Sequence, residues 1–492
     1  MPATPAIAAK SPKQKAGLAV WMERALEECN HASAGFEADP VHDLRVALRR
    51  CRSMADGLMA IDPDPSWKQL KKAGKQLFSS LGDLRDMQVM EEWTRRLGDA
   101  SDPVTDALLQ FLLGRESQLK DEAAKALANF DHKQWKRWSA SLPRRAARMR
   151  SGSLICKHLA LERLTEAHNL HRRALRGQSQ AAFHRLRIGI KRFRYIVENF
   201  LPEQHAAWSD DLKELQDLLG EVHDLDVLWT TALQIQACPD QESRSRWHSI
   251  ITKERNARIE TYKQKMAGKD SLWQVWRAEL PCGKQVEAAA LMRLKLWASF
   301  LDPDFRHSQH VTQLALQLYD GLRENDLEQR RILQLAALLH DVGRSKREKN
   351  HHKTSCRMIQ RLNPPLGCSA ATMHLAGIVA RYHRGALPRA GQKTLSGLAP
   401  AQRRMVVKLA GMLRLANAFD TERNGRIQRL QVAELNGCLA IAAQGYTSRD
   451  GTAEQIAAAR HLLETYYRRP ILVRSLRLSK PRTANRRLKR AA

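Results

Sequence analysis

The sequence is poor in several features that would point to common protein classes. Aromatic residues make up 6% of the 492 positions, so a surface of base-stacking rings is not favoured. The eight cysteines are scattered and form no C-x-x-C pair, which predicts buried, reduced thiols rather than a zinc site or a disulfide framework. No apolar run approaches the ~18 residues of a membrane span, and the first residues lack the apolar core of a signal peptide. We therefore expect a cytoplasmic protein that does not insert into membranes.

Acidic residues are also scarce relative to basic ones. The chain has 52 Asp and Glu against 82 Lys and Arg, a formal net charge of +30. Such an excess attracts a polyanion, for which nucleic acid, an anionic membrane surface and inorganic polyphosphate are the candidates. The hydrophobic content of 43% is that of a globular protein. The length predicts two to four domains.

One helical stretch occurs twice. Residues 41–52 read VHDLRVALRRCR, and residues 183–194 read FHRLRIGIKRFR, with the two histidines 142 positions apart. In both copies apolar residues recur at three- and four-residue spacing, which predicts a helix with one buried face. A histidine and four basic residues form a second stripe beside that face. A single stripe is most often a solvated helix surface, but two stripes that match position by position favour a binding surface. The stripe residues are His42, Arg45, Arg49, Arg50 and Arg52 in the first copy, and His184, Arg187, Lys191, Arg192 and Arg194 in the second.

A second repeated block follows each stripe. It reads LGDLRDMQV at residues 81–89 and LGEVHDLDV at 219–227, and in both copies a lysine, Lys75 or Lys213, lies seven positions before the glycine. The shared aspartate, Asp86 or Asp224, either orients an arginine or serves as a helix cap or an ordinary ion-pair partner. Two repeats, over about 15–150 and 155–280, can each hold about four helices. They predict two helical bundles related by a pseudo-two-fold axis, with the two stripe helices facing one another or a shared groove.

The composition of the stripes indicates the kind of anion. The planar guanidinium of arginine makes two parallel hydrogen bonds to a phosphate. Cations about 5–6 Å apart along a helix suit a chain of repeating negative groups better than one small ligand. A histidine among so many cations tends to be neutral and gains its charge only in acid. The stripes therefore predict a surface for a linear polyanion.

The two blocks, each present twice, resemble the CHAD family, the α-helical domain named for its conserved histidines. The resemblance covers about residues 15–280. It implies a two-bundle helical domain that is not catalytic, binds inorganic polyphosphate in a basic central groove and locates to polyphosphate granules. The positions that match the basic surface of the family are the ten stripe residues together with Lys75 and Lys213.

The second half carries a different constellation. From Ile332 the sequence runs ILQLAALLHDVG, an apolar helix that ends in His340 and Asp341 and is stopped by Gly343. A buried His-Asp pair needs a compensating partner, and a divalent metal accepts both imidazole nitrogen and carboxylate oxygen. One such pair is more often a cap and a core histidine. The ordered set around it is stronger evidence, and consists of His307, His351, His352, His383 and Asp420.

This set resembles the HD superfamily of metal-dependent phosphohydrolases. The segments HDVG, HHKTS, VARYHRGALP and LAGMLRLANAFD are similar to the carboxy-terminal domain of the exopolyphosphatase/guanosine pentaphosphate phosphohydrolase family, over about 287–478. The resemblance implies one or two Mn, Mg or Fe ions, with His340 and Asp341 as catalytic residues. It assigns His307, His340, Asp341 and Asp420 to a first metal, and His351 or His352 together with His383 to a second. His310 is the alternative to His307.

The resemblance to the second family stops at one point. In that family, polyphosphate is cleaved in actin-like domains ahead of the HD part, and no Gly-rich phosphate loop or strand-helix alternation occurs here before residue 280. Three hypotheses therefore stand. The chain captures polyphosphate and hydrolyses it or a phosphorylated nucleotide; or it is a non-catalytic granule-targeting or regulatory protein; or it binds nucleic acid, although no helix-turn-helix, zinc-finger or RNA-binding signature is present.

The expected fold is mainly α, with a small β element near the end. Two short runs, 430–435 and 438–443, flank Asn436-Gly437, a strong hairpin signal. A helix over about 452–468 and a strand over 471–478 follow. We expect residues 1–14 to be disordered, 15–280 to form the polyphosphate-binding domain and 287–478 the phosphohydrolase-like domain. The basic tail, 479–492, is either disordered or a polyanion-binding arm.

Overall fold

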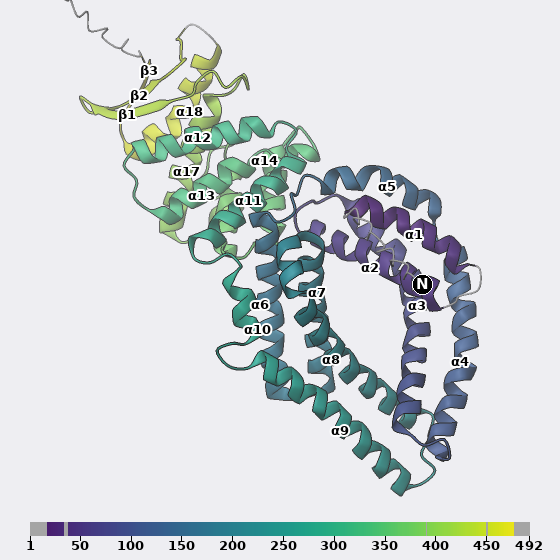
Figure 1. The fold of residues 1–492 in the computed structure, drawn as a ribbon. Helices are drawn as coiled ribbons and strands as arrows, with labels where there is room; N and C mark the ends of the chain where they lie inside the picture. The colour runs from purple at the N-terminus through teal and green to yellow at the C-terminus, as the bar shows by residue number, and fades with distance from the viewer. Residues whose placement is uncertain (1–16, 34–37, 390, 449–450, 477–492) are drawn as a thin grey trace, which may run out of the picture. The chain divides into compact units, whose positions relative to one another are not determined.

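The computed structural model describes residues 17–33, 38–389, 391–448 and 451–476 (Figure 1). The predicted disordered segment 1–14 and the basic tail 479–492 lie outside these residues. The chain divides after Ala289 into two compact units. Within the described ranges, none of the helices combines the length and apolar character that crossing a membrane requires. The predicted mainly-α class is confirmed, because helices dominate both units and the strands form a single small sheet.

The described residues of the first unit up to 278 form two sets of five helices, one more per set than the sequence indicated. The first set is α1 (Leu18–Ala32), α2 (Ala38–Met59), α3 (Pro65–Leu97), α4 (Pro103–Ala128) and α5 (His132–Ala146). The second set is α6 (Leu154–Gly177), α7 (Gln180–Phe200), α8 (Pro202–Gln234), α9 (Gln241–Met266) and α10 (Leu272–Ala278). Helices with the same place in the two sets pack on each other, α2 on α7 and α3 on α8. This self-pairing is what a pseudo-two-fold relation between the repeats produces.

The two sets differ in the loop that precedes α3 or α8. The stripe histidines are 142 positions apart, whereas Gly82 and Gly220 are 138 apart. The difference of four arises because five residues separate α2 from α3 but one residue, Leu201, separates α7 from α8. The longer loop is anchored by buried Asp62, which accepts hydrogen bonds from Trp67 Nε1 (2.8 Å) and Arg145 Nε (2.7 Å). The insertion is therefore absorbed without displacing α3.

The stripe helices α2 and α7 bury the apolar positions that the periodicity predicted. These are Val41, Leu44, Leu48, Cys51, Ala55 and Leu58 on α2, and Phe183, Leu186, Ile190, Phe193, Val197 and Phe200 on α7. Gly57 allows the two helices to approach closely, because a Cβ there would lie 2.6 Å from Phe200 Cε2. Burial of a large apolar side chain stabilises the fold by about 1.5–3 kcal/mol. The buried faces thus fix α2 and α7 together and leave their basic stripes beside the interface.

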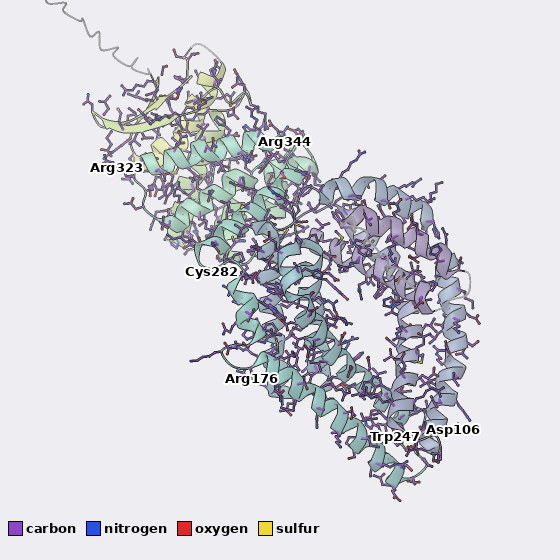
Figure 2. All side chains as sticks on the ribbon, in the orientation of Figure 1. Asp106, Arg176, Trp247, Cys282, Arg323 and Arg344 are labelled. Carbon is purple, nitrogen blue, oxygen red and sulfur yellow. The ribbon has the colours of Figure 1, made fainter. Side chains whose placement is uncertain are left out.

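The long helices form two pairs, α3 with α4 and α8 with α9 (Figure 1). Their far ends meet in an apolar cluster that includes Trp93, Leu108, Leu228 and Trp247. Trp247 Nε1 also donates to Asp102 Oδ2 (2.6 Å), and Asp102 caps the N-terminus of α4. Figure 2 shows Trp247 of α9 near Asp106 in the first turn of α4. This contact joins the two repeats at a second place, away from α2 and α7.

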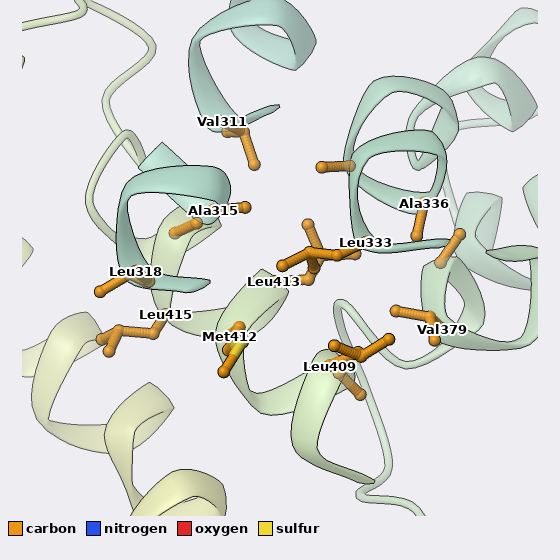
Figure 3. Packing of buried hydrophobic residues seen from close by; sticks show 14 of the residues in the cluster. Val311, Ala315, Leu318, Leu333, Ala336, Val379, Leu409, Met412, Leu413 and Leu415 are labelled. Atoms are coloured by element: carbon orange, nitrogen blue, oxygen red, sulfur yellow. The ribbon is translucent and has the colours of Figure 1, made fainter. Parts of the chain in front are cut away.

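The second unit is a helical domain with a small sheet at its end. Its helices are α11 (Lys284–Leu301), α12 (Phe305–Gly321), α13 (Leu327–Leu339), the 3₁₀ turn η1 (Val342–Ser345), α14 (His351–Arg361), α15 (Ala370–Arg381), α16 (Lys393–Ser396), α17 (Pro400–Ala418) and α18 (Gly451–Tyr467). Figure 3 shows the core, in which α12, α13, α15 and α17 contribute side chains such as Val311, Leu333, Val379 and Leu413. This core holds the helix ends that carry the predicted metal residues.

The predicted hairpin is present with the expected bounds. Strands β1 (Leu430–Leu435) and β2 (Cys438–Ala443) pair antiparallel, and Asn436-Gly437 turns between them with positive φ at both residues. Strand β3 (Ile471–Ser475) then joins β2 in parallel, and α18 makes the crossover. Residues 477 and 478 of the predicted third strand lie outside the described ranges. Nearly all of β2 is buried, because it is the central strand.

Candidate functional site

The His-Asp pair of the second unit lies on a tight turn. Helix α13 ends at Leu339, His340 follows as its C-cap, and η1 begins directly after Asp341. Gly343 is required here, because a Cβ would collide with the backbone of His351 and Ser355 on α14. Its amide nitrogen donates to Ser355 Oγ (2.9 Å). The turn therefore brings the first residue of α14, His351, against His340 and Asp341.

Three histidines present the same ring nitrogen to Asp341. The Nδ1 atoms of His340, His351 and His383 each contact the carbonyl oxygen three residues earlier, at 2.7, 2.9 and 2.7 Å. Such a bond places the proton on Nδ1 and directs Nε2 away from the helix. The three Nε2 atoms lie 3.5, 3.1 and 3.8 Å from Asp341 Oδ1. A fixed tautomer with a backbone partner is typical of histidines that ligate metals.

His307 of α12 completes a five-residue group, which we call the Asp341 cluster. It consists of His307, His340, Asp341, His351 and His383, all of them buried. The cluster contains two overlapping triads whose ligand atoms lie within 4.8 Å of one another: His307, His340 and Asp341, and Asp341, His351 and His383. Two triads that share one carboxylate are an arrangement in which one or two divalent cations fit.

The protonation states in the cluster also fit a cation. His340 is fully buried, and its Nε2 has no hydrogen-bond partner among the described residues. Burial lowers the pKa of His340 and, more strongly, that of His383. Burial alone would raise the pKa of Asp341, but the neighbouring His340, His351 and Arg423 hold it well below its usual range. The hydrogen bond to Asp341 instead raises the pKa of His351, so a cation would compete with a proton at this ring. Neutral imidazoles around an ionised carboxylate are the forms that bind divalent metals.

The first unit has a cavity of about 320 Å³ where the stripe helices meet, which we call the basic groove. Arg49, Arg52, Lys71, Lys191 and Arg192 line it, together with Phe78 and Tyr195. The guanidinium groups of Arg52 and Arg49 lie 4.5 and 5.9 Å from the centres of the Phe78 and Tyr195 rings. The Nε atoms of Arg49 and Arg52 are buried and have no acceptor among the described residues. A buried donor without an acceptor is unfavourable, and a bound anion would supply one.

A second cavity of about 550 Å³ lies where α3 and α8 cross, and we call it the axial pocket. Its cations include Arg187 and Lys191, and its acids include Asp86 and Asp224. Both aspartates lie in the middle of their helices, so neither is a cap. Burial and the nearby Arg187 lower the pKa of Lys191 to about 8, whereas burial raises that of Asp224 to about 6. Lys191 lines both cavities and therefore links the axial pocket to the basic groove.

Comparison with known proteins finds a family match in each half of the chain. Residues 22–233 match the family model of the CHAD domain, and residues 295–442 match that of the Ppx/GppA phosphatase, domain III. The chain carries a CHAD domain and a Ppx/GppA domain III. No curated protein matches the chain. Among solved structures, the CHAD domain from the plant Ricinus communis matches with 24% identity and a TM-score of 0.35, covering 55% of this chain and 89% of that chain.

Several stripe residues of the CHAD domain are used within the fold. Arg45 donates to the carbonyl oxygen of Leu81, where Gly82 leaves room for its guanidinium. Arg50 forms an ion pair with Glu198 of α7, and Arg192 donates to Glu166 of α6 (3.1 Å). The ring of His184 lies 4.8 Å from that of His223, and burial with Arg187 and Lys191 lowers its pKa, so it is neutral as expected. Arg50 and Arg192, which hold equivalent positions in the two stripes, thus both have acidic partners within the fold.

Seven of the twelve predicted residues of the CHAD domain line neither cavity: Arg45, Arg50 and His184, described above, and four more. His42, Lys75 and Lys213 are exposed, and Lys213 has Asp217 within 3.9 Å. Arg194 is half-buried and lines neither cavity. Conversely, Lys71, Arg85 and Arg96 line the cavities but were not singled out from the sequence. The sequence alone gives no reason to select these three residues, because they lie on α3, outside the repeated basic stripe.

In the Ppx/GppA domain, the structure distinguishes between the histidines that the sequence left as alternative metal ligands. His307 and His351 belong to the Asp341 cluster, whereas His310 Nε2 contacts the carbonyl oxygen of Ile427 (2.9 Å). His352 is half-buried and in neither triad, and burial with His351 lowers its pKa to about 4. Asp420 also lies outside the triads. Its Oδ2 accepts a hydrogen bond from His307 Nδ1 (2.7 Å) and so orients that ring.

Arg423 is a site residue that the sequence did not reveal. Its Nη2 donates to Asp341 Oδ2 (2.7 Å), and its Nη1 donates to Asp304 Oδ2 (2.9 Å). Its backbone is left-handed, with φ 55°, which is uncommon for a residue other than glycine. The available signal was its place in the Thr-Glu-Arg-Asn-Gly turn directly after Asp420. Arg423 neutralises the carboxylate oxygen that faces away from the histidines.

We expect Arg50→Ala to destabilise the CHAD domain. Glu198 is 6% exposed at its side chain, so removal of Arg50 leaves a buried carboxylate without its cation. The free energy of unfolding should fall by about 2–4 kcal/mol, as measured by urea denaturation. Arg192→Ala is the matched control, because its partner Glu166 is 37% exposed and the loss should be under about 1 kcal/mol. Equal losses in the two variants would contradict this assignment.

Proposed function

We propose that this protein binds inorganic polyphosphate through its CHAD domain and hydrolyses phosphoanhydride or phosphoester bonds at the Asp341 cluster. The observation that carries the proposal is the convergence of three imidazole Nε2 atoms on Asp341 Oδ1, each ring held by a backbone carbonyl. The matches to a CHAD domain and to a Ppx/GppA phosphatase domain support phosphate chemistry in both halves.

The basic groove supports polyphosphate as the polymer. Cations from α2, α3 and α7 line it, and two of its arginines have buried Nε atoms that lack an acceptor among the described residues. Charge-assisted hydrogen bonds to phosphate oxygens would satisfy these donors. The Phe78 and Tyr195 rings already have guanidinium groups beside them, so they offer little free surface on which a base could stack. This favours an inorganic chain over nucleic acid, and polyphosphate granules are the location we propose.

In the Ppx/GppA domain, we assign the triads of the Asp341 cluster as metal ligands. A divalent cation held there would supply activation of water and polarisation of a phosphoryl oxygen. Among Mn, Mg and Fe, the imidazole-rich donor set suits Fe best, since Mg and Mn prefer oxygen ligands. Asp341 is the ligand that both triads share, and His340 belongs to the first triad. Asp420 orients His307, and His352 lies beside the cluster without belonging to it. Arg423 holds Asp341 in its ionised form and places a guanidinium at the edge of the cluster.

Metal analysis of the purified protein, combined with a screen for phosphate release, tests the proposal. We expect one or two metal ions per chain, preferentially Fe, and release from polyphosphate or a phosphorylated nucleotide. Tight polyphosphate binding without metal or release would favour a granule-targeting or regulatory protein. Displacement of polyphosphate by DNA or RNA at equal phosphate concentration would favour a nucleic-acid binder.

Polyphosphate affinity should rise as the pH falls from 9 to 5. Lys191, with a pKa of about 8, gains its charge on the way down, and Asp224, with a pKa of about 6, then loses its negative charge. Both changes make the cavities more cationic. The dissociation constant for polyphosphate should fall by about tenfold or more between pH 9 and pH 5, since one pKa unit corresponds to a factor of ten in an equilibrium constant. Titration at fixed ionic strength measures it.

Two variants separate the steps of this pH profile. Asp224→Asn should remove the change near pH 6, and Lys191→Arg should remove the change near pH 8. A pH profile that neither variant alters would contradict the placement of the polymer at these cavities.

A further inference from the structure

The Asp341 cluster is bordered by two cavities. One, of about 610 Å³, lies between α12 and the turn at residues 420–428, and we call it the α12 pocket. The other, of about 380 Å³, lies between the ends of α15 and α17 and helix α18, and we call it the α18 pocket. His307 and Arg423 line both pockets, and His383 also lines the second. The cluster is therefore reached from two directions.

The α12 pocket is lined by groups that donate to anions. Arg306, Gln309 and Gln313 are exposed and spaced by three and four residues, so they share one face of α12. Arg423 and Asn424 contribute from the facing turn. Among the described residues that line it, Asp420 alone has a carboxylate, and this group already accepts a hydrogen bond from His307. An anion in this pocket would therefore meet donors on both walls and little repulsion.

The α18 pocket has the same chemical character. Its cations are Arg384, Arg414 and Arg423, and none of the described residues that line it has a carboxylate. Arg414 is held in place because its Nη1 donates to the carbonyl oxygens of Tyr382 (3.0 Å) and Gly385 (3.1 Å). On α18, Ala458 and Ala459 leave the pocket open.

Neither pocket offers a platform for an organic group. Among the described residues that line them there is no phenylalanine, tyrosine or tryptophan, so a nucleobase would lack the large aromatic rings on which bases commonly stack. Cations and amides on both sides of the cluster instead suit a substrate that is anionic along its whole length. This argues for a phosphate chain over a nucleotide.

We propose that the Ppx/GppA domain cleaves linear polyphosphate internally, with one part of the chain in the α12 pocket and the other in the α18 pocket. This rests on the proposed function and specifies its substrate and its mode of cleavage. Because His307 and Arg423 line both pockets, the chain can continue on both sides of them, which favours cleavage between the chain ends over removal of a terminal phosphate. The oxygen of water bonds to one phosphorus as the bond from that phosphorus to the bridging oxygen breaks. Each of the two new chain ends formally takes one hydrogen of the water.

The test uses the full-length, metal-loaded protein and polyphosphate whose two ends are blocked as phosphoramidates. We expect the blocked chain to be cut as fast as the open chain, and gels to show intermediate lengths before orthophosphate accumulates. If the blocked chain resists and orthophosphate is the first product of the open chain, internal cleavage is refuted while the proposed hydrolysis stands. If no phosphate compound is cleaved at all, both fail.

A binding experiment tests the two pockets independently of turnover. In full-length, metal-free protein that carries Arg49→Ala and Lys191→Ala, tetrapolyphosphate binding is measured by calorimetry. Arg306→Ala and Arg384→Ala, one in each pocket, should each weaken binding by about tenfold, since a hydrogen bond to a charged group contributes about 1.5 kcal/mol or more. Both side chains are exposed, so the fold is preserved. Arg361→Ala, exposed on α14 and outside both pockets, is the control. If only one of these two substitutions weakened tetrapolyphosphate binding, the proposal that the chain spans both pockets would be refuted.

Discussion

Asp341→Asn is expected to eliminate metal binding and phosphate release together. The substitution preserves size but removes the negative charge that both triads share. Loss of an outer partner alone lowers metal affinity by 10–100-fold, so loss of this ligand should lower it by at least about 100-fold. The metal-free variant should also lose about 2 kcal/mol of stability, because Arg423 and His351 lose a charged partner. Elemental analysis and a phosphate-release assay measure the first two effects, and urea denaturation the third.

Asp304→Asn provides a matched control for this substitution. Asp304 accepts a hydrogen bond from the same arginine, Arg423, but belongs to neither triad. It caps α12, and asparagine caps a helix as well as aspartate does. Stability should therefore fall by under about 1 kcal/mol, through the weaker contact with Arg423, and the metal content should be unchanged. If both variants lost metal equally, Arg423 rather than the shared carboxylate would determine binding. If Asp341→Asn kept its metal, the assignment of the cluster as a metal centre would fail.

The repeated helices and the hairpin are the parts of the fold that could be predicted from the sequence. The two stripes share their apolar spacing because both helices bury the same face, and the self-pairing of α2 with α7 follows from that. The hairpin bounds were predictable because Asn436 and Gly437 both adopt positive φ, which few residue pairs do readily. The fifth helix of each set was not expected. Helix α10 is seven residues long and carries little periodicity, whereas α5 is 15 residues long and buries Trp135, Trp138 and Leu142 at helical spacing.

The candidate sites could be predicted only in part. Order along the chain brought His307, His340, Asp341, His351 and His383 into one list, but it could not separate His351 from His352, which are adjacent. Their difference arises from the Gly343 contact, which presses the start of α14 against the His-Asp turn. Likewise, charge spacing identified the stripes but not which cations have intramolecular partners. Arg50 differs from Arg49 only because Glu198 of the other repeat lies beside it.

Arg49→Ala combined with Lys191→Ala should abolish retention of polyphosphate by the CHAD domain. The two residues hold equivalent positions in the repeats, and both line the basic groove. Each charged contact to phosphate contributes about 1.5–3 kcal/mol, so losing both should weaken binding by about 100-fold or more. The slope of log affinity against log salt should become shallower by about 1.5, because two fewer phosphates are neutralised. Fluorescence titration with polyphosphate over a series of salt concentrations measures both quantities.

The charge-matched control for this double variant is Lys75→Ala combined with Lys213→Ala. It removes the same two positive charges, but from exposed side chains outside both cavities. At physiological salt the field of an exposed charge is largely screened beyond about 8 Å, so affinity should change little and the salt slope hardly at all. Equal weakening in the two double variants would mean that net charge, rather than the paired stripes, holds the polymer. An unchanged salt slope in the Arg49→Ala, Lys191→Ala double variant would show that the polymer binds elsewhere. If two phosphate contacts are lost, fewer counterions are released on binding, and the slope must become shallower.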